Sequence, residues 1–511
     1  MEGALPPGPV VLRLEGVTKR FGTLLANDAI DLELRSGECL ALLGENGAGK
    51  TTLTSILFGH YVADAGRVLV ADPDGRLQPL TAGSPHAALA AGIGMVHQHF
   101  VLATTLSALD NIVLGTEPLW RLSRRSRAAR RKVERLIATC GLAVPLDAPV
   151  ASLSIGERQR VEILKALYRD VRVLILDEPT AVLTPQQAER LFQTLDGLTA
   201  SGLAVLFISH KLDEVMRLCR RVAVLRAGRK VADLVLQGTS PAAIAEAMVG
   251  RAVSLPRRDA QQPGPPVLEL RGVEVGRDVT DVDLMVHERE IVGIAGVSGN
   301  GQRALAGLLA GTIPASGGEV LLLGRPWPGG GARGAIGAGV GRIPEDRLGD
   351  GVVAELSIAQ NLALEGYRRH GLQRLGLVRR ARVAAHARDL IRAYDVRCEG
   401  PGQRIGLLSG GNIQKLLLGR VLEAGPRLLL ADQPTRGLDI GAVAFVHGRL
   451  LEARRRGAGI VLISEDLEEL LRLADRVAVM HRGRLSDTMP AKGVTVRELG
   501  LLMTGQSLHA A

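Results

Sequence analysis

The chain has 511 residues, of which 46% are hydrophobic and 23% charged, and its formal net charge is +10. This length exceeds one ordinary hydrophobic core and the composition is that of a folded protein, so we expect at least two globular domains and exclude an intrinsically disordered chain. The four cysteines lack CxxC spacing, which argues against a disulfide framework or a zinc site.

The N-terminal segment predicts neither export nor membrane insertion. Residues 1–10 lack the basic start and apolar core of a secretory signal. The longest uncharged stretch, residues 77–109, is interrupted by prolines and histidines and is not a credible membrane span. We therefore expect a flexible tail at residues 1–10 and a chain that resides in the reducing cytoplasm.

Residues 11–250 are predicted to form an α/β domain. Apolar runs such as residues 40–44 and 173–177 have the length of buried strands, and they alternate with amphipathic stretches such as residues 161–170. This alternation favours a mostly parallel sheet covered by helices.

A phosphate-binding loop follows the first of these strands. The segment matches G-x-x-x-x-G-K-[ST] and lies between an apolar strand and a helix, the context that this motif requires. Backbone N–H groups of such a loop and the helix N-terminus attract phosphate oxygens. Lys50 is expected to reach the β- and γ-phosphates, and the Thr51 hydroxyl is expected to ligate Mg²⁺. The predicted nucleotide-binding residues are Gly44, Glu45, Asn46, Gly47, Ala48, Gly49, Lys50, Thr51 and Thr52.

Two adjacent acids end the later strand of this domain. Asp177 is interpreted as a Mg²⁺ partner and Glu178 as the base that polarises the attacking water. A helix-capping role is the alternative for such acids, but a phosphate loop in the same domain favours the catalytic interpretation. A further apolar strand ends in His210, and a lone histidine is more often structural than catalytic.

Much of the positive charge lies in two arginine-rich stretches, residues 121–132 and 367–382, which are both predicted to be helical. Solvated helix faces are favoured as their interpretation over a patch that binds nucleic acid or an anionic membrane surface.

The second half of the chain repeats the first. Residues 11–17, 153–160 and 174–180 return in the same order and with nearly constant spacing as residues 267–273, 408–415 and 429–435. We predict a second homologous domain at residues 267–506, preceded by a Pro-rich linker at 251–266 and followed by a tail at 507–511.

The order of these motifs resembles that of ABC transporter ATPases: phosphate loop, Gln98, the signature LSIGE at residues 153–157, the acidic strand end and His210. The resemblance covers almost the whole chain twice. It implies two tandem P-loop ABC-type ATPase domains of the α/β class, each with a mostly parallel sheet, a helical subdomain and an antiparallel β edge. It also implies ATP and Mg²⁺ as cofactors.

The resemblance assigns further residues. Gln98 would contact Mg²⁺ and sense the γ-phosphate, and His210 would contact the γ-phosphate. Phe21 would stack on adenine, although an ordinary core phenylalanine is nearly as well supported. In this family two domains pair head to tail, and the partner's signature completes each ATP site. The residues that would complete the first site are Ser409, Gly410 and Gly411.

The second half departs from the family pattern. Its phosphate loop has Gln302 for the lysine and Arg303 for the Mg²⁺-binding hydroxyl, while Gln433 replaces the catalytic glutamate and Glu465 replaces the histidine. Loss of one ammonium about 4 Å from a phosphate weakens binding by roughly 4 kcal/mol at an effective dielectric near 20. This half is therefore predicted to hold a degenerate site.

The signatures depart in the opposite half. Residues 408–412 are intact, whereas the first signature has Ile155 where glycine is usual, and Thr184 stands where the second half has Asp439. In a head-to-tail pair, the degenerate phosphate loop and the altered signature would fall in the same composite site, which leaves one fully equipped site.

Tandem domains with a degenerate second loop resemble the energising subunits of importers for simple sugars and nucleosides. Residues 94–102 and 111–115 look closest to the nucleoside branch, and residues 343–347 are also typical of the group. This implies integral-membrane permease partners, a solute-binding protein in the same system without direct contact, and a peripheral location on the cytoplasmic membrane face. Monosaccharide import is the first alternative, and a soluble tandem ATPase acting on ribosomes or DNA is the second, although no nucleic acid partner is expected.

Overall fold

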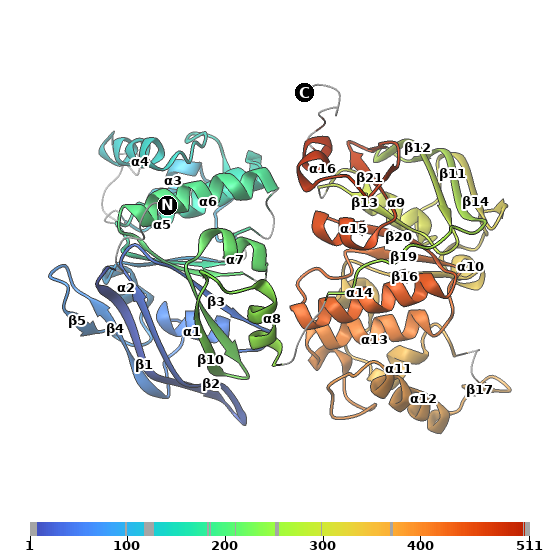
Figure 1. Cartoon of the computed structure of the whole chain (residues 1–511), viewed down its shortest axis with the longest axis horizontal. Coiled ribbons are helices and arrows are strands. Elements are labelled where there is room, and N and C mark those ends of the chain that lie inside the picture. Colours follow the sequence, from blue (N-terminus) through green and yellow to red (C-terminus); the bar gives the residue numbers. More distant parts are fainter. Residues whose placement is uncertain are drawn as a thin grey trace. The chain divides into compact units, whose positions relative to one another are not determined.

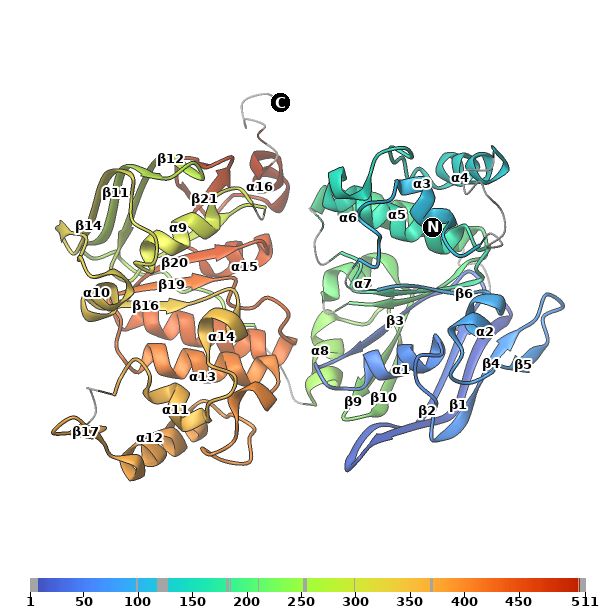
Figure 2. The same ribbon diagram turned by 180° about the vertical axis from the view of Figure 1, so that it is seen from behind.

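The computed structural model describes residues 8–97, 100–116, 127–180, 183, 185–209, 211–250, 255–297, 299–367, 371–503 and 505. The chain divides into two compact units, Met1–Val253 and Ser254–Ala511. Both units are drawn in Figure 1, and Figure 2 gives the reverse view.

The first unit contains an antiparallel and a mostly parallel sheet. The antiparallel sheet has the order β2 (Leu24–Arg35), β1 (Val10–Phe21), β4 (Ala65–Ala71) and β5 (Leu77–Pro79). The second sheet has the order β10 (Arg229–Val235), β9 (Arg221–Arg226), β3 (Cys39–Gly44), β8 (Ala204–Ile208), β7 (Val173–Asp177) and β6 (Ile93–Val96). Its strands from β9 to β6 are parallel, and only the edge strand β10 is antiparallel.

Helices cover both faces of this parallel sheet. α1 lies on one side, and α3, α4, α5 and α6 lie together on the other (Figures 1 and 2). The helices are α1 (Lys50–Leu57), α2 (Pro85–Ala90), α3 (Ala108–Val113), α4 (Arg127–Cys140), α5 (Ile155–Leu167), α6 (Pro185–Ala200), α7 (Leu212–Leu218) and α8 (Pro241–Val249).

The second unit repeats this plan. Its antiparallel sheet has the order β12 (Val279–His287), β11 (Pro266–Val275), β14 (Gly317–Leu322) and β15 (Arg325–Pro326). Its main sheet has the order β16 (Val340–Ile343), β19 (Leu428–Asp432), β20 (Gly459–Ser464), β13 (Ile291–Ala295), β21 (Arg476–His481) and β22 (Arg484–Leu485), and β23 (Met489–Pro490) pairs with β21.

Helices and one small hairpin complete the second unit. The hairpin consists of β17 (Gln373–Arg374) and β18 (Leu377–Val378). The helices are α9 (Gln302–Leu309), α10 (Gly331–Gly337), α11 (Ile358–Ala363), α12 (Arg380–Ala393), α13 (Gly410–Leu422), α14 (Ile440–Arg455), α15 (Leu467–Leu473) and α16 (Val496–Met503). Short helical turns lie at Val150–Ser152, Arg347–Gly351 and Ile405–Leu407.

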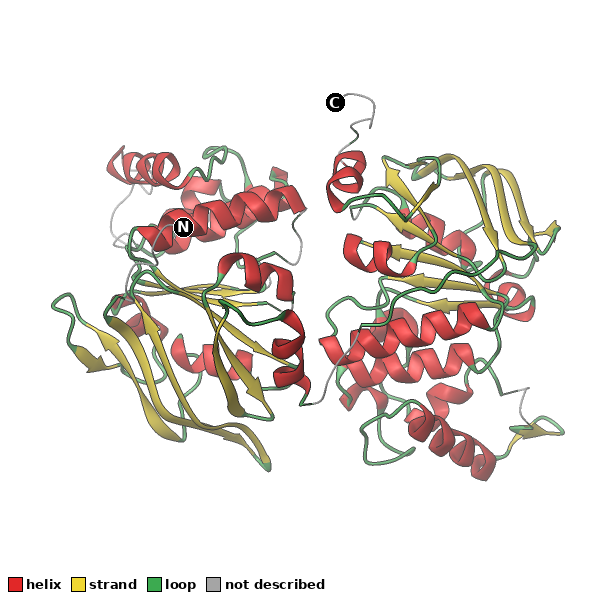
Figure 3. Cartoon of the chain, in the orientation of Figure 1, coloured by secondary structure: helices red, strands yellow, loops and turns green. Residues whose placement is uncertain are grey.

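The two units have the same strand order, because β9-β3-β8-β7-β6 of the first corresponds to β21-β13-β20-β19-β16 of the second. Figure 3 shows in each unit a sheet flanked by helices and a separate antiparallel sheet. The predicted α/β class, with a parallel core, a helical subdomain and an antiparallel edge, is confirmed.

The side chains of the central strand β13 contribute alternately to two hydrophobic cores of the second unit. Val292 and Ile294 of β13 face the antiparallel sheet and α9, whereas Ile291 and Ala295 face the core that contains α13 and α14. Successive side chains of a strand point to opposite faces, so a strand covered on both sides must be apolar throughout. Coverage of the sheet on both faces therefore explains the uninterrupted apolar runs of the sequence.

The predicted helix at residues 367–382 is wrong for much of its length. Residues 373–378 form β17 and β18, and α12 begins only at Arg380. Leu375 and Gly376 have φ values of 50° and 81°, which a right-handed helix excludes. Of the other arginine-rich stretch, residues 127–132 lie in α4 and residues 117–126 lie outside the described part of the chain.

The segment between the repeats is held by the second unit. Residues 255–265 form no helix or strand, yet the Arg258 guanidinium donates to the Leu471 carbonyl at 2.6 Å. Arg454, which is fully buried, donates to the Asp259 carbonyl at 3.0 Å and to both carboxylate oxygens of Asp475 at 2.7 and 3.0 Å. A buried guanidinium thus joins this segment to the strand β21 region of the second unit.

Within the described ranges, no helix combines the length and apolar character that crossing a bilayer requires.

Replacing Arg454 by methionine should destabilise the second unit by about 3 kcal/mol, because it leaves the partly buried Asp475 carboxylate without its cation. Chemical denaturation of the full chain, followed at the transition assigned to the second unit, measures this loss. Arg455→Met is the matched control: Arg455 also pairs with Asp259, at 3.2 Å, but is exposed, and its loss should lower stability by about 1 kcal/mol or less. Equal effects of the two substitutions would contradict the assignment.

Candidate ATP sites

The first phosphate loop connects β3 to α1. Gly49 caps α1 with a φ of 101°, and a Cβ at this position would collide with the Ala26 carbonyl oxygen. The buried Asn27 side chain donates to the Gly49 carbonyl at 3.1 Å and fixes the loop from the antiparallel sheet. The Lys50 ammonium lies inside the loop, where it donates to the carbonyls of Gly44 at 2.6 Å and Glu45 at 3.0 Å. The loop therefore holds a positive charge at its centre, bound by two backbone carbonyls.

The two acids lie beside this loop, at the end of β7. Burial raises the pKa of Asp177 to about 6; the neighbouring Glu178 carboxylate adds to the rise, and Lys50 opposes it. Glu178 has a left-handed backbone with a φ of 48°, and its N–H donates to the Ile208 carbonyl of β8 at 2.9 Å. This conformation turns the chain sharply at the strand end, which separates the directions of the two adjacent carboxylates.

Phe21 ends β1 with 42% of its surface exposed. Its ring makes an edge contact with Tyr61 at a centroid distance of 5.4 Å, and the Lys19 ammonium lies 5.4 Å from its centroid. The alternative that Phe21 is an ordinary core residue is therefore wrong. Three predicted positions, Gln98, His210 and Thr184, lie outside the described residues.

A largely buried carboxylate that sequence reasoning missed joins the ends of β7 and β8. Glu214 of α7 accepts hydrogen bonds from the Thr180 hydroxyl at 2.7 Å and from the Ser209 hydroxyl at 2.9 Å. Thr180 lies two residues after Glu178, and Ser209 directly precedes His210. Glu214 thus fixes both segments that carry the predicted catalytic groups.

The second unit contains the same connection. Glu469 accepts from Thr435 at 2.8 Å and from Ser464 at 2.7 Å, and it also contacts His447 Nε2 at 3.0 Å. All of these groups are largely or fully buried. The second unit therefore retains the hydrogen bonds that join the strand ends, although it does not retain the predicted catalytic residues.

The second phosphate loop keeps its backbone shape but has a different interior. Gly301 caps α9 with a φ of 109°, close to the value of its counterpart in the first unit. The Gln302 amide donates to the Val297 carbonyl at 3.0 Å, and its oxygen accepts from the Asn300 N–H at 3.2 Å. A neutral side chain thus crosses the loop in the place of the ammonium, and the adjacent Arg303 is exposed.

The acidic strand end is altered in the same unit. Burial and the Glu345 carboxylate together raise the pKa of Asp432 to about 7, and Arg342 and other arginines oppose the rise. Gln433 has the same left-handed backbone as Glu178, and its side-chain oxygen accepts from the Glu465 N–H at 3.3 Å. An amide cannot take up a proton, so Gln433 cannot act as the general base that Glu178 is predicted to be in the first unit.

The serines of the two signature segments differ in their hydrogen-bond partners. Ser154 caps α5 in a capping box: its N–H and its hydroxyl both donate to the Glu157 carboxylate, at 2.8 and 2.7 Å, and these bonds lower the Glu157 pKa. Ser409 begins α13 without a side-chain cap bond, and its hydroxyl accepts from the Asn412 amide at 3.0 Å. A carboxylate thus lies at the first signature and a neutral amide at the second. An anion would be repelled by the carboxylate, so the second signature is the more favourable place for it to bind.

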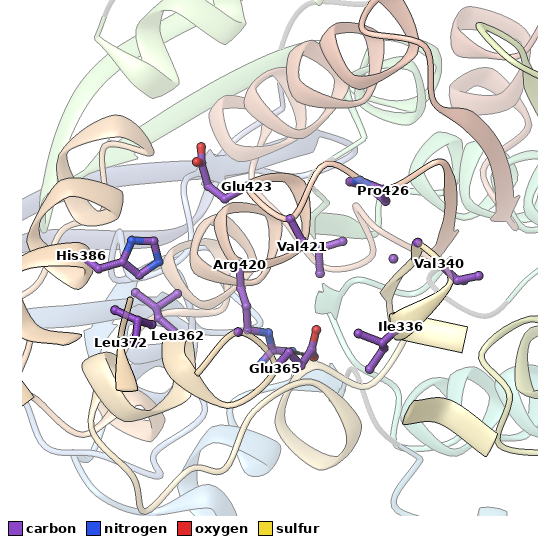
Figure 4. A pocket seen from close by; sticks show the side chains of 14 residues that line it. Ile336, Val340, Leu362, Glu365, Leu372, His386, Arg420, Val421, Glu423 and Pro426 are labelled. Carbon is purple, nitrogen blue, oxygen red and sulfur yellow. Dashed lines mark ion pairs between the residues drawn. The ribbon is translucent and has the colours of Figure 1, made fainter. Parts of the chain in front are cut away.

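A pocket in the second unit is a separate feature. It lies between β16 and the helices α11, α12 and α13, and no residue of the phosphate loop lines it. Figure 4 shows Arg420 reaching towards Glu365, with which it pairs at 3.0 Å. Burial lowers the Arg420 pKa, and Glu365 opposes this shift. The pair therefore fastens α13 to the chain that follows α11.

Comparisons with known proteins agree with this geometry. The family model described as ABC transporter matches residues 27–181 and 279–436. The chain is 39% identical over 505 residues to the nucleoside import ATP-binding protein NupA of Lactococcus lactis, covering 98% of this chain and 99% of NupA. It is 41% identical over 509 residues to the guanosine import ATP-binding protein NupO of Bacillus subtilis, covering 98% of each. It is 42% identical over 502 residues to the ribose import ATP-binding protein RbsA 1 of Rubrobacter xylanophilus, covering 97% and 98%.

The solved structure of an RNase-L inhibitor has the same fold, with a TM-score of 0.62 and 17% identity over 93% of this chain and 90% of that one. Fold and phosphate loop together define an ATP-binding protein with two P-loop domains. The chain belongs to the ABC transporter family, in which it is a transport ATPase.

Glu214→Ala should lower ATP turnover at least tenfold while leaving nucleotide affinity nearly unchanged, because it releases the segments beside Glu178 and His210 but not the phosphate loop. Steady-state ATPase assays and equilibrium nucleotide binding measure the two effects separately. Glu469→Ala is the matched control in the other unit and should destabilise the chain without a comparable loss of turnover. Glu214→Gln, which retains one acceptor, should restore part of the rate. Equal losses of affinity and turnover in Glu214→Ala would contradict a positioning role.

Proposed function

We propose that this protein is the ATP-binding and hydrolysing subunit of an importer for nucleosides, bound to permease subunits at the cytoplasmic face of the membrane. Full-length similarity to NupA and NupO supports the nucleoside assignment. Similarity of the same extent to RbsA 1 favours monosaccharide import as the second candidate. The solute-binding protein of the system needs no contact with this subunit.

The observation that carries the mechanism is the contrast between the two phosphate loops. The first holds the Lys50 ammonium, and the second holds the neutral Gln302 amide. An ammonium is the charge that attracts the β- and γ-phosphates, and the adjacent Glu178 is the carboxylate available to accept a proton from the attacking water. We therefore assign ATP hydrolysis to the site of the first loop; Gln98 and His210 are proposed as further catalytic groups on the family resemblance alone.

The donor set at the first loop fits Mg²⁺. Thr51 offers an exposed hydroxyl at the start of α1, and Asp177 offers a half-buried carboxylate beside Lys50. Mg²⁺ prefers such oxygen donors and is usually held by one or two protein groups together with phosphate oxygens. Thr51, Asp177 and Gln98 would hold the ion, which when bound neutralises phosphate charge. In the second unit, Arg303 stands in the place of the hydroxyl and would repel a cation.

The site is proposed to be completed by the second signature. Ser409, Gly410 and Gly411 would contact the nucleotide bound to the first loop, as the family resemblance implies. The neighbour of the Ser409 hydroxyl supports this assignment, because the hydroxyl accepts from a neutral amide, whereas the serine of the first signature is bound to the Glu157 carboxylate. The first signature, which carries Glu157, would then face the degenerate loop.

Lys50→Ala and Ser409→Arg should each abolish ATP turnover, the first by removing the phosphate-binding charge and the second by filling the serine position with a long side chain. Gln302→Ala and Ser154→Arg are the matched changes at the other site and should retain most of the activity. ATPase assays of the purified chain with its permease measure all four. Comparable losses in both pairs would refute the model of one hydrolytic site.

The solute is tested by reconstitution with the membrane subunits. A nucleoside-loaded binding protein should stimulate ATP hydrolysis severalfold, whereas a binding protein loaded with ribose, galactose or xylose should not. Stimulation by a sugar-loaded protein alone would establish the second candidate. Stimulation by RNA or DNA without any membrane protein would overturn both.

A further inference from the structure

A short hairpin projects from the helical part of the second unit. β17 pairs with β18 through Gln373 and Val378 and through Arg374 and Leu377. Both views show it extending beyond the neighbouring helices of this unit (Figures 1 and 2). No function assigned above uses it.

The base of the hairpin is firmly attached. Leu372 is buried, and it packs with Ala363 and Val383 in a small core of its own. The Arg379 N–H donates to the Leu372 carbonyl at 2.8 Å and closes the base. The position of the hairpin on this unit is therefore fixed by α11 and α12.

The tip, in contrast, presents apolar side chains to solvent. Leu375 is 94% exposed, Leu377 76% and Val378 54%. A single exposed leucine is unremarkable in a folded protein, but here three exposed apolar side chains lie within four residues of a projecting turn. Such a surface gains free energy only when something covers it.

The turn itself disfavours the leucine that it contains. Leu375 and Gly376 both have positive φ, at 50° and 81°, as in a two-residue hairpin turn of type I′. Asn, Asp and Gly are the residues that suit this backbone, and a leucine there is strained. With its side chain almost wholly in solvent, Leu375 contributes no packing in return. Folding of the hairpin therefore does not explain this residue.

The apolar tip is surrounded by uncompensated positive charge. Arg374, Arg379, Arg380 and Arg382 are all exposed, and no aspartate or glutamate occurs between Glu365 and Asp389. None of the four arginines forms an ion pair with a carboxylate of the described part of the chain. By contrast, Arg130 in α4 is paired with Glu134 and Asp147.

We propose that the hairpin and the start of α12, residues 373–382, bind the anionic surface of a lipid bilayer. The leucines and the valine would enter the boundary between headgroups and acyl chains, and the guanidinium groups would bind lipid phosphates. A nucleic acid would use the arginines but would leave the apolar tip in water. This surface is independent of the solute and of the hydrolytic site, and it gives the chain a contact with the membrane besides any permease.

The test is flotation of the full chain with vesicles of phosphatidylglycerol and phosphatidylcholine, or of phosphatidylcholine alone. The chain should float with the first and not with the second, and salt should weaken its binding. Leu375→Asn combined with Leu377→Ser should weaken binding at least roughly tenfold through lost apolar burial. Arg379→Gln combined with Arg380→Gln should weaken it by roughly tenfold or more.

Two substitutions elsewhere are the matched controls. Val235→Ser removes another exposed apolar side chain, on β10, and Arg130→Gln removes a paired arginine; neither should change vesicle binding. Leu375→Asn alone should keep or raise the free energy of unfolding, because asparagine suits the left-handed backbone. All hairpin variants should retain basal ATP turnover.

Three results would overturn the proposal. Hairpin variants that float as well as the wild type would exclude this surface from lipid binding. Equal flotation with both kinds of vesicle would exclude anionic headgroups as the ligand. Variants that float normally but no longer copurify with membrane protein would show that the hairpin binds protein. Because ATP turnover is measured beside flotation, a failure here is distinguishable from a failure of the proposed transport function.

Discussion

The arrangement of the proposed hydrolytic site depends on a largely buried carboxylate that ties together the ends of two neighbouring parallel strands. In the first unit Glu214 accepts hydrogen bonds from hydroxyls on the chains that leave β7 and β8. The backbone makes a second link, from the Glu178 N–H to the Ile208 carbonyl. The phosphate loop leaves β3, which is the next strand, so the loop, the acids and the histidine-bearing segment are all positioned by one short edge of the sheet. Small displacements of that edge would separate groups that must act on the same phosphate.

The second unit shows which parts of this design belong to the fold and which belong to the chemistry. It keeps the strand order, the left-handed residue at the strand end and the buried glutamate. It lacks the ammonium, the hydroxyl and the general base. Side chains that hold the frame are thus retained, whereas those that would meet nucleotide are replaced by neutral groups or by groups of the wrong charge. The fold of such a domain therefore does not depend on those side chains.

The sequence predicted the parallel sheets, the duplication and the first phosphate loop, because these depend on local patterns such as apolar runs, glycine spacing and repeated motifs. Glu214 escaped notice because Thr180, one of its two partners, lies 34 residues away along the chain, and a glutamate on an ordinary amphipathic helix predicts a solvated side chain. The exposure of Phe21 and the attachment of Asp259 to Arg454 were equally hidden, since both depend on tertiary contacts. The hairpin at residues 373–378 was mistaken for helix because arginine and leucine favour helices, while the deciding feature was the backbone of a single Leu-Gly turn.

The Gln302 side chain that crosses the second loop limits what a single substitution can restore. Under the proposed assignment of hydrolysis to the first loop, a lone change of Gln302 to lysine would supply charge to a loop that still has an arginine at the hydroxyl position and an amide at the strand end. A second competent site would then require coordinated changes at Gln302, Arg303 and Gln433, in a loop whose backbone already has the required shape.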